Sequence, residues 1–491
     1  MSLDPRTPVL VGAGQVNQRE VNPAVEPVDL MAAAAREAAD PRVLAAVDSI
    51  RVVNLLSWRY RDPGLLLAAR IGAPEAATQY SGIGGNTPQS LVNQACVDIQ
   101  QGRADVVLLA GGETWRTRMR LRARGIRPDW TRQDESVPVP LGAGTDVPMA
   151  GPAEDRIGLD RPSFIYPLFE QALRIAAGES VADHQRRVGD LWAGFSAVAA
   201  DNPHAWVRDR MSAEQIAQPT PDNRMISWPY PKLMNSNNMV DQAAVVILTS
   251  AEKAQRLQIP PDTWVFPHAG TESHDTYLIG ERRDLHRCPA IRIAGRRVLE
   301  LAGVGVDDLD FVDLYSCFPS AVQVAARELG LPLDRPLTVT GGLTFAGGPW
   351  NNYVMHSIAT MADVLRRHPG SRGLITANGG YLTKHSFGVY STTPPGRPFR
   401  REDVQAEVDR EPTRATLIEW EGTGSVESWT VPFDREGKPE KAFLAVRTPA
   451  GERVLALVTD ADAAATAVAQ DIAGTPVRVH ADGRAEIVST T

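Results

Sequence analysis

Hydrophobic and polar positions along the first 115 residues alternate in a way that is typical of an α/β sheet. Ala104–Ala110 is a continuous apolar run bounded by two glycines, which predicts a strand buried on both faces. Pro88–Gln101, just before it, carries apolar residues at helical spacing. This order favours βαβ units around a central sheet. Earlier runs predict further strands and helices at Pro8–Ala13, Val28–Ala39, Ser49–Leu56 and Pro63–Ile71.

The pattern changes between residues 116 and 230 and then returns. Arg116–Arg127 is strongly basic, and the helices predicted at Pro167–Ala177 and Ser180–Ala199 carry many charges. We interpret 116–230 as an insertion that folds over the first α/β unit and serves as a cover or binding lobe. The α/β alternation then resumes with elements predicted at Ala243–Thr249, Ala290–Leu301, Asp310–Tyr315, Ser320–Leu329, Asn352–Arg367 and Gly373–Ala377.

The last hundred residues have a different character. Ser391–Asp409 is rich in Pro and Arg and predicts a linker, after which strand patterns and one Ala-rich helix follow. If Thr416–Trp420 and Val426–Phe433 form one bent strand, the order is β-β-β-α-β-β, as in a five-stranded OB-type barrel. The expected parts are therefore 1–115 and 231–392 as two α/β halves, 116–230 as the insertion and 410–491 as an OB-like domain.

Composition narrows the class of protein. The chain has 491 residues, of which 43% are hydrophobic and 22% charged, and this excludes a mainly disordered protein. A net charge of −8 argues against a nucleic-acid binder. The three cysteines suit neither a disulfide framework nor a zinc motif, so no metal is expected. The start lacks a signal peptide and no run of about 18 apolar residues occurs, so we expect a cytoplasmic protein without a membrane span.

A repeat lies within the two α/β halves. Gly84-Gly85 is followed by a helix, a buried strand and the pair Gly111-Gly112, and Gly347-Gly348 is followed by the same elements and Gly379-Gly380. This pattern predicts a duplicated fold in which two helix N-termini meet near a shared axis. Helix N-termini favour anions and developing negative charge.

Four motifs, in this order along the chain, resemble the thiolase superfamily. They are AGGET at Ala110–Thr114, the stretch Pro229–Ser250, DLYSCFP at Asp313–Pro319 and GGLTFAGGP at Gly341–Pro349. The third is most similar to the sterol-carrier-protein thiolases. The resemblance covers about residues 5–392, and the C-terminal region resembles the extra domain of type 1 thiolase-like proteins. It implies a layered thiolase fold, coenzyme A thioester ligands and a role in lipid metabolism.

The catalytic positions of this family hold other residues here. The nucleophilic cysteine corresponds to Gly85 and the motif serine to Thr87. The histidine and aspartate of the third motif correspond to Tyr315 and Ser316. The histidine of the fourth motif corresponds to Gly348, and the second cysteine and its glycine to Asn378 and Gly380. Acyl transfer needs a thiolate and an activating base, so the resemblance implies a protein like acetyl-CoA acetyltransferase that lacks classical thiolase activity.

Some functional groups remain. In the family, backbone N–H groups form an oxyanion hole, a role that the resemblance gives to Gly85 and Gly380. Asn86, Thr87, Ser316 and Gly348 are expected around the same ligand. Tyr315, His385 and Asn378 are the candidate catalytic residues, and each also has an ordinary structural interpretation. Cys96 and Cys317 are expected to be buried, inert thiols.

Three functions stay open at this point. The first is a binder of coenzyme A or acyl-CoA thioesters that needs no other cofactor. The second is an acyl-CoA retro-aldolase or acyltransferase that uses Tyr315 or His385. The third is a non-catalytic scaffold whose barrel docks a partner. The basic run Arg116–Arg127 either contacts coenzyme A phosphates or is a solvated face. A homodimer is expected from family habit, with a monomer as the alternative.

Overall fold

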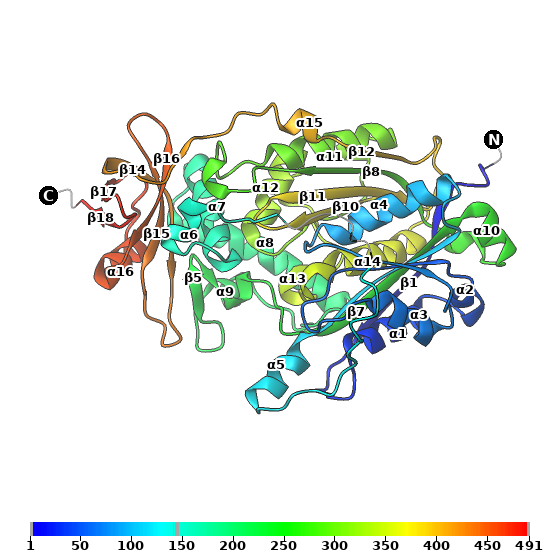
Figure 1. Ribbon diagram of the computed structural model, residues 1–491. Helices are drawn as coiled ribbons and strands as arrows, with labels where there is room; N and C mark the ends of the chain where they lie inside the picture. Colours follow the sequence, from blue (N-terminus) through cyan, green and yellow to red (C-terminus); the bar gives the residue numbers. More distant parts are fainter. Residues whose placement is uncertain (1–2, 141, 143–146, 489–491) are drawn as a thin grey trace.

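Two five-stranded sheets form the centre of the molecule in the computed structural model, which describes residues 3–140, 142 and 147–488. The first sheet has the order β1 (Pro8–Asn17), β7 (Asp241–Ser250), β4 (Val106–Thr114), β2 (Ser49–Val52) and β3 (Ala77–Tyr80). The second has the order β12 (Arg400–Asp403), β8 (Phe266–His274), β11 (Lys384–Ser391), β10 (Arg372–Gly379) and β9 (Phe311–Asp313). Together with their helices, these sheets give the layered thiolase-type α/β fold (Figure 1).

Helices lie between the sheets and on their outer faces. α4 (Thr87–Gln100) and α14 (Tyr353–Arg367) contact strands of both sheets, so each is buried on most sides. α1 (Pro27–Ala38) and α3 (Pro63–Ile71) cover the outside of the first sheet, near α2 (Pro41–Ala45). α11 (Pro289–Ala302) covers the second sheet and packs on α12 (Pro319–Leu329). The loops before α4 and α14 therefore meet in the middle of the molecule.

Strand β7 belongs to the first half of the fold, although the boundary expected from the sequence lies at residue 230. It pairs antiparallel with β1 and with β4 in two long ladders, and all ten of its residues are buried. The apolar run predicts the strand, but it does not reveal which sheet takes it. The first half thus extends to Ser250, followed by α10 (Ala251–Arg256).

The insertion covers both halves, and not the first α/β unit alone. Its first part stays on the first half, where the Trp130 indole donates to Pro23 O and the Thr131 hydroxyl donates to Glu26. Its later helices pack on α12 and on the C-terminal domain, because the apolar face of α7 is buried there. Its elements are α5 (Trp115–Ala123), α6 (Pro152–Ile157), α7 (Pro162–Ala177), α8 (Val181–Asp201), α9 (Ala213–Ala217), β5 (Met225–Trp228) and β6 (Tyr230–Pro231).

The segment expected to be a free linker is partly ordered into the second sheet. β12 pairs in parallel with β8, Arg401 forms an ion pair with Glu272, and Phe399 is only 3% exposed. α15 (Gln405–Val408) follows and buries Val408. The proline and arginine content predicts a linker, but composition does not reveal that one short strand of this segment pairs with a sheet built from distant parts of the chain.

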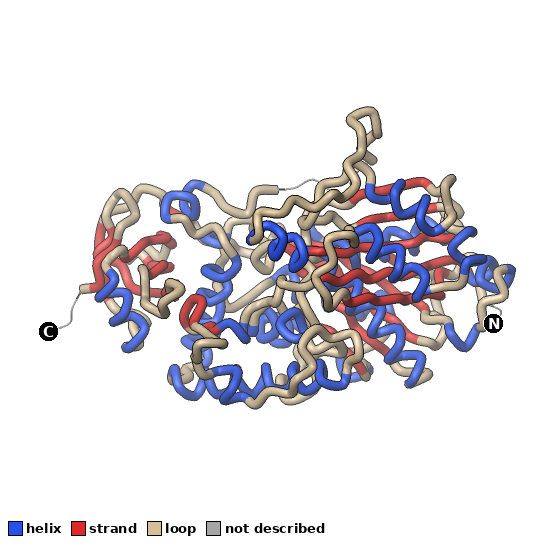
Figure 2. Tube along the Cα trace, turned by 90° about the horizontal axis from the view of Figure 1, so that it is seen from below, coloured by secondary structure: helices blue, strands red, loops and turns tan. Residues whose placement is uncertain are grey.

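The C-terminal domain is β-rich and lies at one end of an elongated molecule (Figure 2). Thr416–Trp420 and Val426–Phe433 do not form one bent strand: β13 (Thr416–Leu417) pairs with β16, whereas β14 (Gly422–Pro432) pairs with β15 and β17. β17 pairs with β18, and a bridge joins Leu457 to Arg484. The OB-type assignment stays a prediction. The remaining elements are β15 (Ala442–Arg447), β16 (Arg453–Val458), α16 (Ala461–Ala469), β17 (Pro476–Val479) and β18 (Ala485–Ile487).

This domain is fixed to the second half and to the insertion by polar contacts. Arg453 is fully buried, forms an ion pair with Glu427, and donates to the carbonyl of Gly280. Arg174 of α7 forms an ion pair with Asp471. The domain and the sheets therefore hold α7 between them.

Candidate functional site

A cavity of about 580 Å³ lies where the two halves meet α7. Its lining comes from the loops before α4 and α14, the ends of β9 and β10, and the first turn of α7. Lys384 is the one charged side chain among the described lining residues. Five residues singled out in the sequence line it together, namely Gly85, Tyr315, Gly348, Asn378 and Gly380.

The position of the family's nucleophile has no room for a side chain. A Cβ atom on Gly85 would lie 2.5 Å from the Tyr315 hydroxyl and 2.5 Å from the Asn378 carbonyl oxygen. Both distances are well inside van der Waals contact, so the tyrosine hydroxyl fills the space that a cysteine would need. Tyr315 and Gly85 thus fit one another across the two halves of the fold.

Tyr315 is held by its own half of the molecule. Its backbone N–H donates to Thr376 Oγ1 (2.8 Å), and its ring packs edge-on against Tyr353 at 5.6 Å between ring centroids. The Tyr353 hydroxyl is itself bound to the buried carboxylate of Asp313. Burial raises the pKa of Tyr315 well above its usual value, so its hydroxyl is neutral and can donate a hydrogen bond.

Asn378 and Tyr166 form the polar floor of the cavity. The Asn378 amide donates to the Tyr166 hydroxyl (2.9 Å), which donates in turn to the Gly380 carbonyl (3.0 Å). Asn378 is 4% exposed, and its Oδ1 atom has no hydrogen-bond partner among the described residues. A buried acceptor without a partner is costly and marks a position where a ligand group can bind.

The other predicted site residues lie behind the cavity wall. Asn86 and Thr87 begin α4, and the Thr87 hydroxyl donates to Gly84 O (2.8 Å). Ser316 is fully buried, with its Oγ 2.7 Å from where a Cβ on Gly342 would lie. None of these three lines the cavity. Cys317 does line it, but burial raises the pKa of its thiol to about 12, so it is not a reactive thiolate at neutral pH.

His385 does not line the cavity. Its Nε2 atom lies 3.0 Å from Leu382 O and 3.4 Å from the Cys288 sulfur, and the side chain is 2% exposed. Burial lowers the pKa of His385 to about 4, which leaves the imidazole neutral. It is the direct cross-strand partner of Asn378 in the antiparallel pair of β10 and β11, so the two side chains lie on the same face of the sheet. The ring of His385 nevertheless contacts Leu382 and Cys288 and is not part of the cavity lining.

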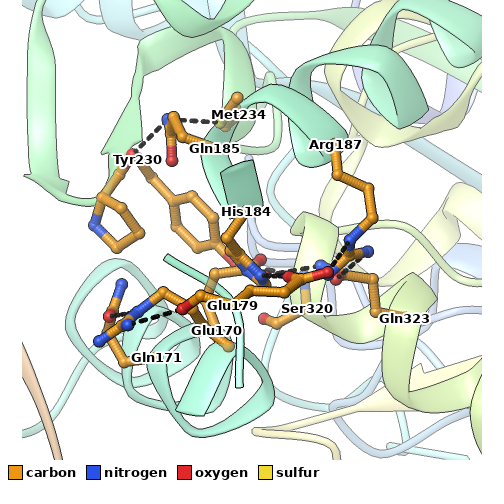
Figure 3. Close-up of polar contacts among 12 residues, drawn as sticks. Glu170, Gln171, Glu179, His184, Gln185, Arg187, Tyr230, Met234, Ser320 and Gln323 are labelled. Carbon is orange, nitrogen blue, oxygen red and sulfur yellow. Dashed lines mark hydrogen bonds and ion pairs between the residues drawn. The ribbon is translucent and has the colours of Figure 1, made fainter. Parts of the chain in front are cut away.

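A buried polar network fixes α7 and therefore Tyr166 (Figure 3). Glu170, one turn after Tyr166, binds His184 of α8, the Tyr230 hydroxyl and the Gln323 amide of α12. Glu179 binds the other nitrogen of His184. Tyr166 is not among the site residues predicted from the sequence, because nothing in its neighbourhood distinguishes it from a core residue of an amphipathic helix.

The structure offers no metal centre in its described part. Within residues 3–140, 142 and 147–488, no three His, Cys, Asp or Glu side chains are grouped in a way that could hold a metal ion. None of the helices described has the length and apolar character needed to cross a bilayer.

The comparison with known proteins decides the family. A crystal structure of a monomeric SCP2-thiolase-like protein type 1 from Mycobacterium smegmatis is 32% identical, with a TM-score of 0.83, over 99% of this chain and 100% of that one. The chain belongs to the type 1 SCP2-thiolase-like proteins. Residues 403–484 match the family model described as the additional C-terminal domain of thiolase-like protein type 1.

The chain is also similar, at lower identity, to acetyl-CoA acetyltransferases and thiolases. An acetyl-CoA acetyltransferase of Methanothermobacter thermautotrophicus is 27% identical over 220 residues, which are 41% of this chain and 55% of that enzyme. The chain thus matches about half of the length of that curated relative. The dimeric peroxisomal thiolase of Saccharomyces cerevisiae is 14% identical with a TM-score of 0.58, over 79% of this chain and 98% of that one, a likeness of fold alone.

Proposed function

We propose that this protein binds a coenzyme A thioester in the cavity and does not carry out the thiolase reaction. The observation that carries the proposal is the contact between Gly85 and Tyr315: the space of the nucleophile is filled by a neutral phenol. A covalent acyl intermediate needs a nucleophile at that point. The cavity itself is of ordinary size for a small-molecule site, and most of its lining is apolar.

The polar groups of the cavity suit a thioester. The Tyr315 hydroxyl and the backbone N–H groups of Gly85 and Gly380 are the proposed donors to the carbonyl oxygen. Asn378 Oδ1 is the proposed acceptor for an amide N–H or hydroxyl of the ligand. The acyl chain would lie against apolar lining residues such as Phe318, Leu343 and Trp350. A role in lipid metabolism follows from this ligand class.

Calorimetric titration of the purified protein with coenzyme A, acetyl-CoA and longer acyl-CoAs tests the proposal. Gly348→Leu is the blocking variant, because Gly348 lines the cavity and a Cβ there meets nothing closer than 3.1 Å. Saturable binding by the natural protein, lost in this variant with an unchanged melting temperature, is the expected result. Equal binding by both proteins would place the ligand elsewhere.

Thiolysis of acetoacetyl-CoA is expected to be absent, and a turnover number of about 1–1000 per second would refute the second part of the proposal.

An acyl-CoA lyase is the second candidate, favoured by the one observation that Tyr315 lines the cavity with its hydroxyl beside Gly85. Its raised pKa suits an acid that protonates an alkoxide during aldol addition, and disfavours a phenolate base. Turnover of a β-hydroxyacyl-CoA, in either direction, separates this enzyme from a binder. His385 is not part of this candidate because it does not line the cavity.

A further inference from the structure

Helix α5 and the turn after it form a basic surface. The α5 surface consists of Arg116, Arg118, Arg120, Arg122, Arg124 and Arg127, of which the last four are exposed. None of the six forms an ion pair with a described carboxylate, although acidic residues outnumber basic ones in this chain by 59 to 51. Only Arg116 and Arg118 make hydrogen bonds, to the carbonyls of Arg19 and Leu56. So dense an unneutralised charge favours an anionic partner.

Further arginines extend the surface on one side. Arg19 and Arg116 both lie over the Trp206 ring, at 4.6 and 5.8 Å from its centroid. Burial, together with the nearby charges of Arg208 and Arg116, lowers the pKa of Arg19. Like charges thus gather on this side of the α5 surface.

The α5 surface begins at the rim of the cavity. Trp115, at the start of α5, packs edge-on against Trp350 with 4.8 Å between ring centroids. Arg118 donates to the carbonyl of Leu56 (2.9 Å). Trp350 and Leu56 both line the cavity. From this rim the helix projects from the lower face of the molecule in Figure 1.

The shape of the surface suits a macromolecule and not a small anion. None of its six arginines lines the cavity described above or any of four other cavities in the described part of the chain. A small phosphate ligand needs several donors converging on one point, whereas these side chains spread over a projecting helix about 14 Å long. The exposed face has one large apolar side chain, Ile126 at 48% exposure, too little for a helix that inserts into a membrane. The net charge of −8 opposes nucleic acid at long range.

We propose that the α5 surface docks an acidic carrier protein, which presents an acyl thioester on a phosphopantetheine arm to the adjacent cavity. The docking face follows from charge complementarity. The delivery of a thioester rests on the proposed function of the cavity. In this arrangement acidic side chains of the carrier lie along α5, and the arm passes Trp350 and Leu56.

The test measures binding of a purified acidic acyl carrier protein, in its acyl-phosphopantetheinyl form and its unmodified form, to the full-length protein. The test variant combines Arg120→Glu, Arg122→Glu and Arg124→Glu, since these side chains are exposed and make no hydrogen bond or ion pair. The control combines Arg367→Glu, Arg397→Glu and Arg435→Glu, which change the net charge equally at exposed positions away from α5. Gly348→Leu closes the cavity, and free acyl-CoA is titrated into every protein.

The natural protein is expected to bind both carrier forms, with affinity that falls steeply as salt rises. The α5 variant should bind at least about tenfold more weakly and still bind free acyl-CoA, whereas the control triple should bind normally. Gly348→Leu should bind the unmodified carrier with the affinity of the natural protein. It should lose only the additional affinity that the acyl-phosphopantetheine arm provides. If the natural protein binds both carrier forms with equal affinity, the proposed delivery of the thioester to the cavity is wrong, whereas the docking of the carrier on α5 still holds.

Two sets of results would overturn the docking proposal. One is the absence of carrier binding, or equal binding by the natural protein and the α5 variant. The other is a comparable, α5-dependent affinity for vesicles rich in anionic phospholipid or for RNA, which would make the surface a general polyanion site. If the α5 variant loses free acyl-CoA as well, the arginines bind the phosphates of the free ligand instead.

Discussion

The Tyr315 hydroxyl lies 2.5 Å from the point where a side chain on Gly85 would begin. The two residues come from different halves of the fold, and each explains the other: glycine leaves the space, and tyrosine fills it. A single change back to the family's cysteine therefore creates a steric clash and not a nucleophile.

Gly85→Ala should lower the free energy of unfolding by about 1–3 kcal/mol, the usual cost of overpacking a core. Gly194→Ala is the matched control, because a Cβ there meets nothing within 4 Å on helix α8 and should stabilise by about 0.5–1 kcal/mol. Urea denaturation measures both. Adding Tyr315→Phe to Gly85→Ala should restore part of the loss, and only part, since the Asn378 carbonyl remains. No restoration at all would mean that the hydroxyl does not restrict residue 85.

Tyr315→Phe keeps the ring and removes one donor from the cavity. If the protein is a binder, its affinity for acyl-CoA should fall by about 0.5–1.5 kcal/mol, the worth of one hydrogen bond. If it is a lyase, turnover of a β-hydroxyacyl-CoA should fall by about 10²–10⁴-fold. Titration and steady-state kinetics on the same preparation distinguish the two. Unchanged affinity and turnover would remove Tyr315 from the site's chemistry.

The network around His184 predicts a pH dependence of stability. Burial alone lowers the pKa of His184, but its bonds to Glu170 and Glu179 outweigh this and raise it above 6.5. The bonds to His184, Tyr230 and Gln323 likewise outweigh burial and lower the pKa of Glu170 below 4.5. The histidine's contribution is therefore full below pH 6.5 and is lost as pH rises through its folded pKa. The glutamate's contribution is full above pH 4.5 and is lost as pH falls through its folded pKa.

His184→Gln should abolish the alkaline part of this dependence, measured as melting temperature between pH 5 and 9. His480→Gln, at a partly exposed position in the C-terminal domain, is the control and should keep the profile of the natural protein. A His184→Gln profile that still falls between pH 6.5 and 8 would assign the effect to another group.

The segment from Phe399 to Arg414 should resist proteases in the native protein. β12 is paired with β8, and Phe399 and Arg414 are both buried, at 3% and 7% exposure. Brief trypsin digestion followed by mass spectrometry should recover no cut at Arg400 or Arg401. Phe399→Ala should weaken the anchoring of β12 and expose these sites. Rapid cleavage of the natural protein there would show that the pairing with β8 opens easily.

The sequence by itself determined the individual strands and helices, through its apolar runs. Ala104–Ala110 and Ala243–Thr249 predicted strands that are β4 and β7, and Pro88–Gln101 predicted a helix that is α4. The layered thiolase fold with an added β-rich domain also followed from motifs in their order along the chain. These features are local, because burial of a strand or helix on both sides requires apolar residues at a fixed spacing.

Only the tertiary structure decided how distant residues meet. That β7 lies between β1 and β4 in the first sheet, and that β12 forms the edge of the second, depends on pairing partners that no local pattern identifies. The sequence presents Gly85 as a missing nucleophile, and the structure shows it as a steric requirement of a residue 230 positions away. His385 is the cross-strand partner of Asn378, yet its ring contacts Leu382 and Cys288 and does not line the cavity. Tyr166 reaches the cavity from the insertion. Such contacts depend on three-dimensional distance, which a one-dimensional spacing does not contain.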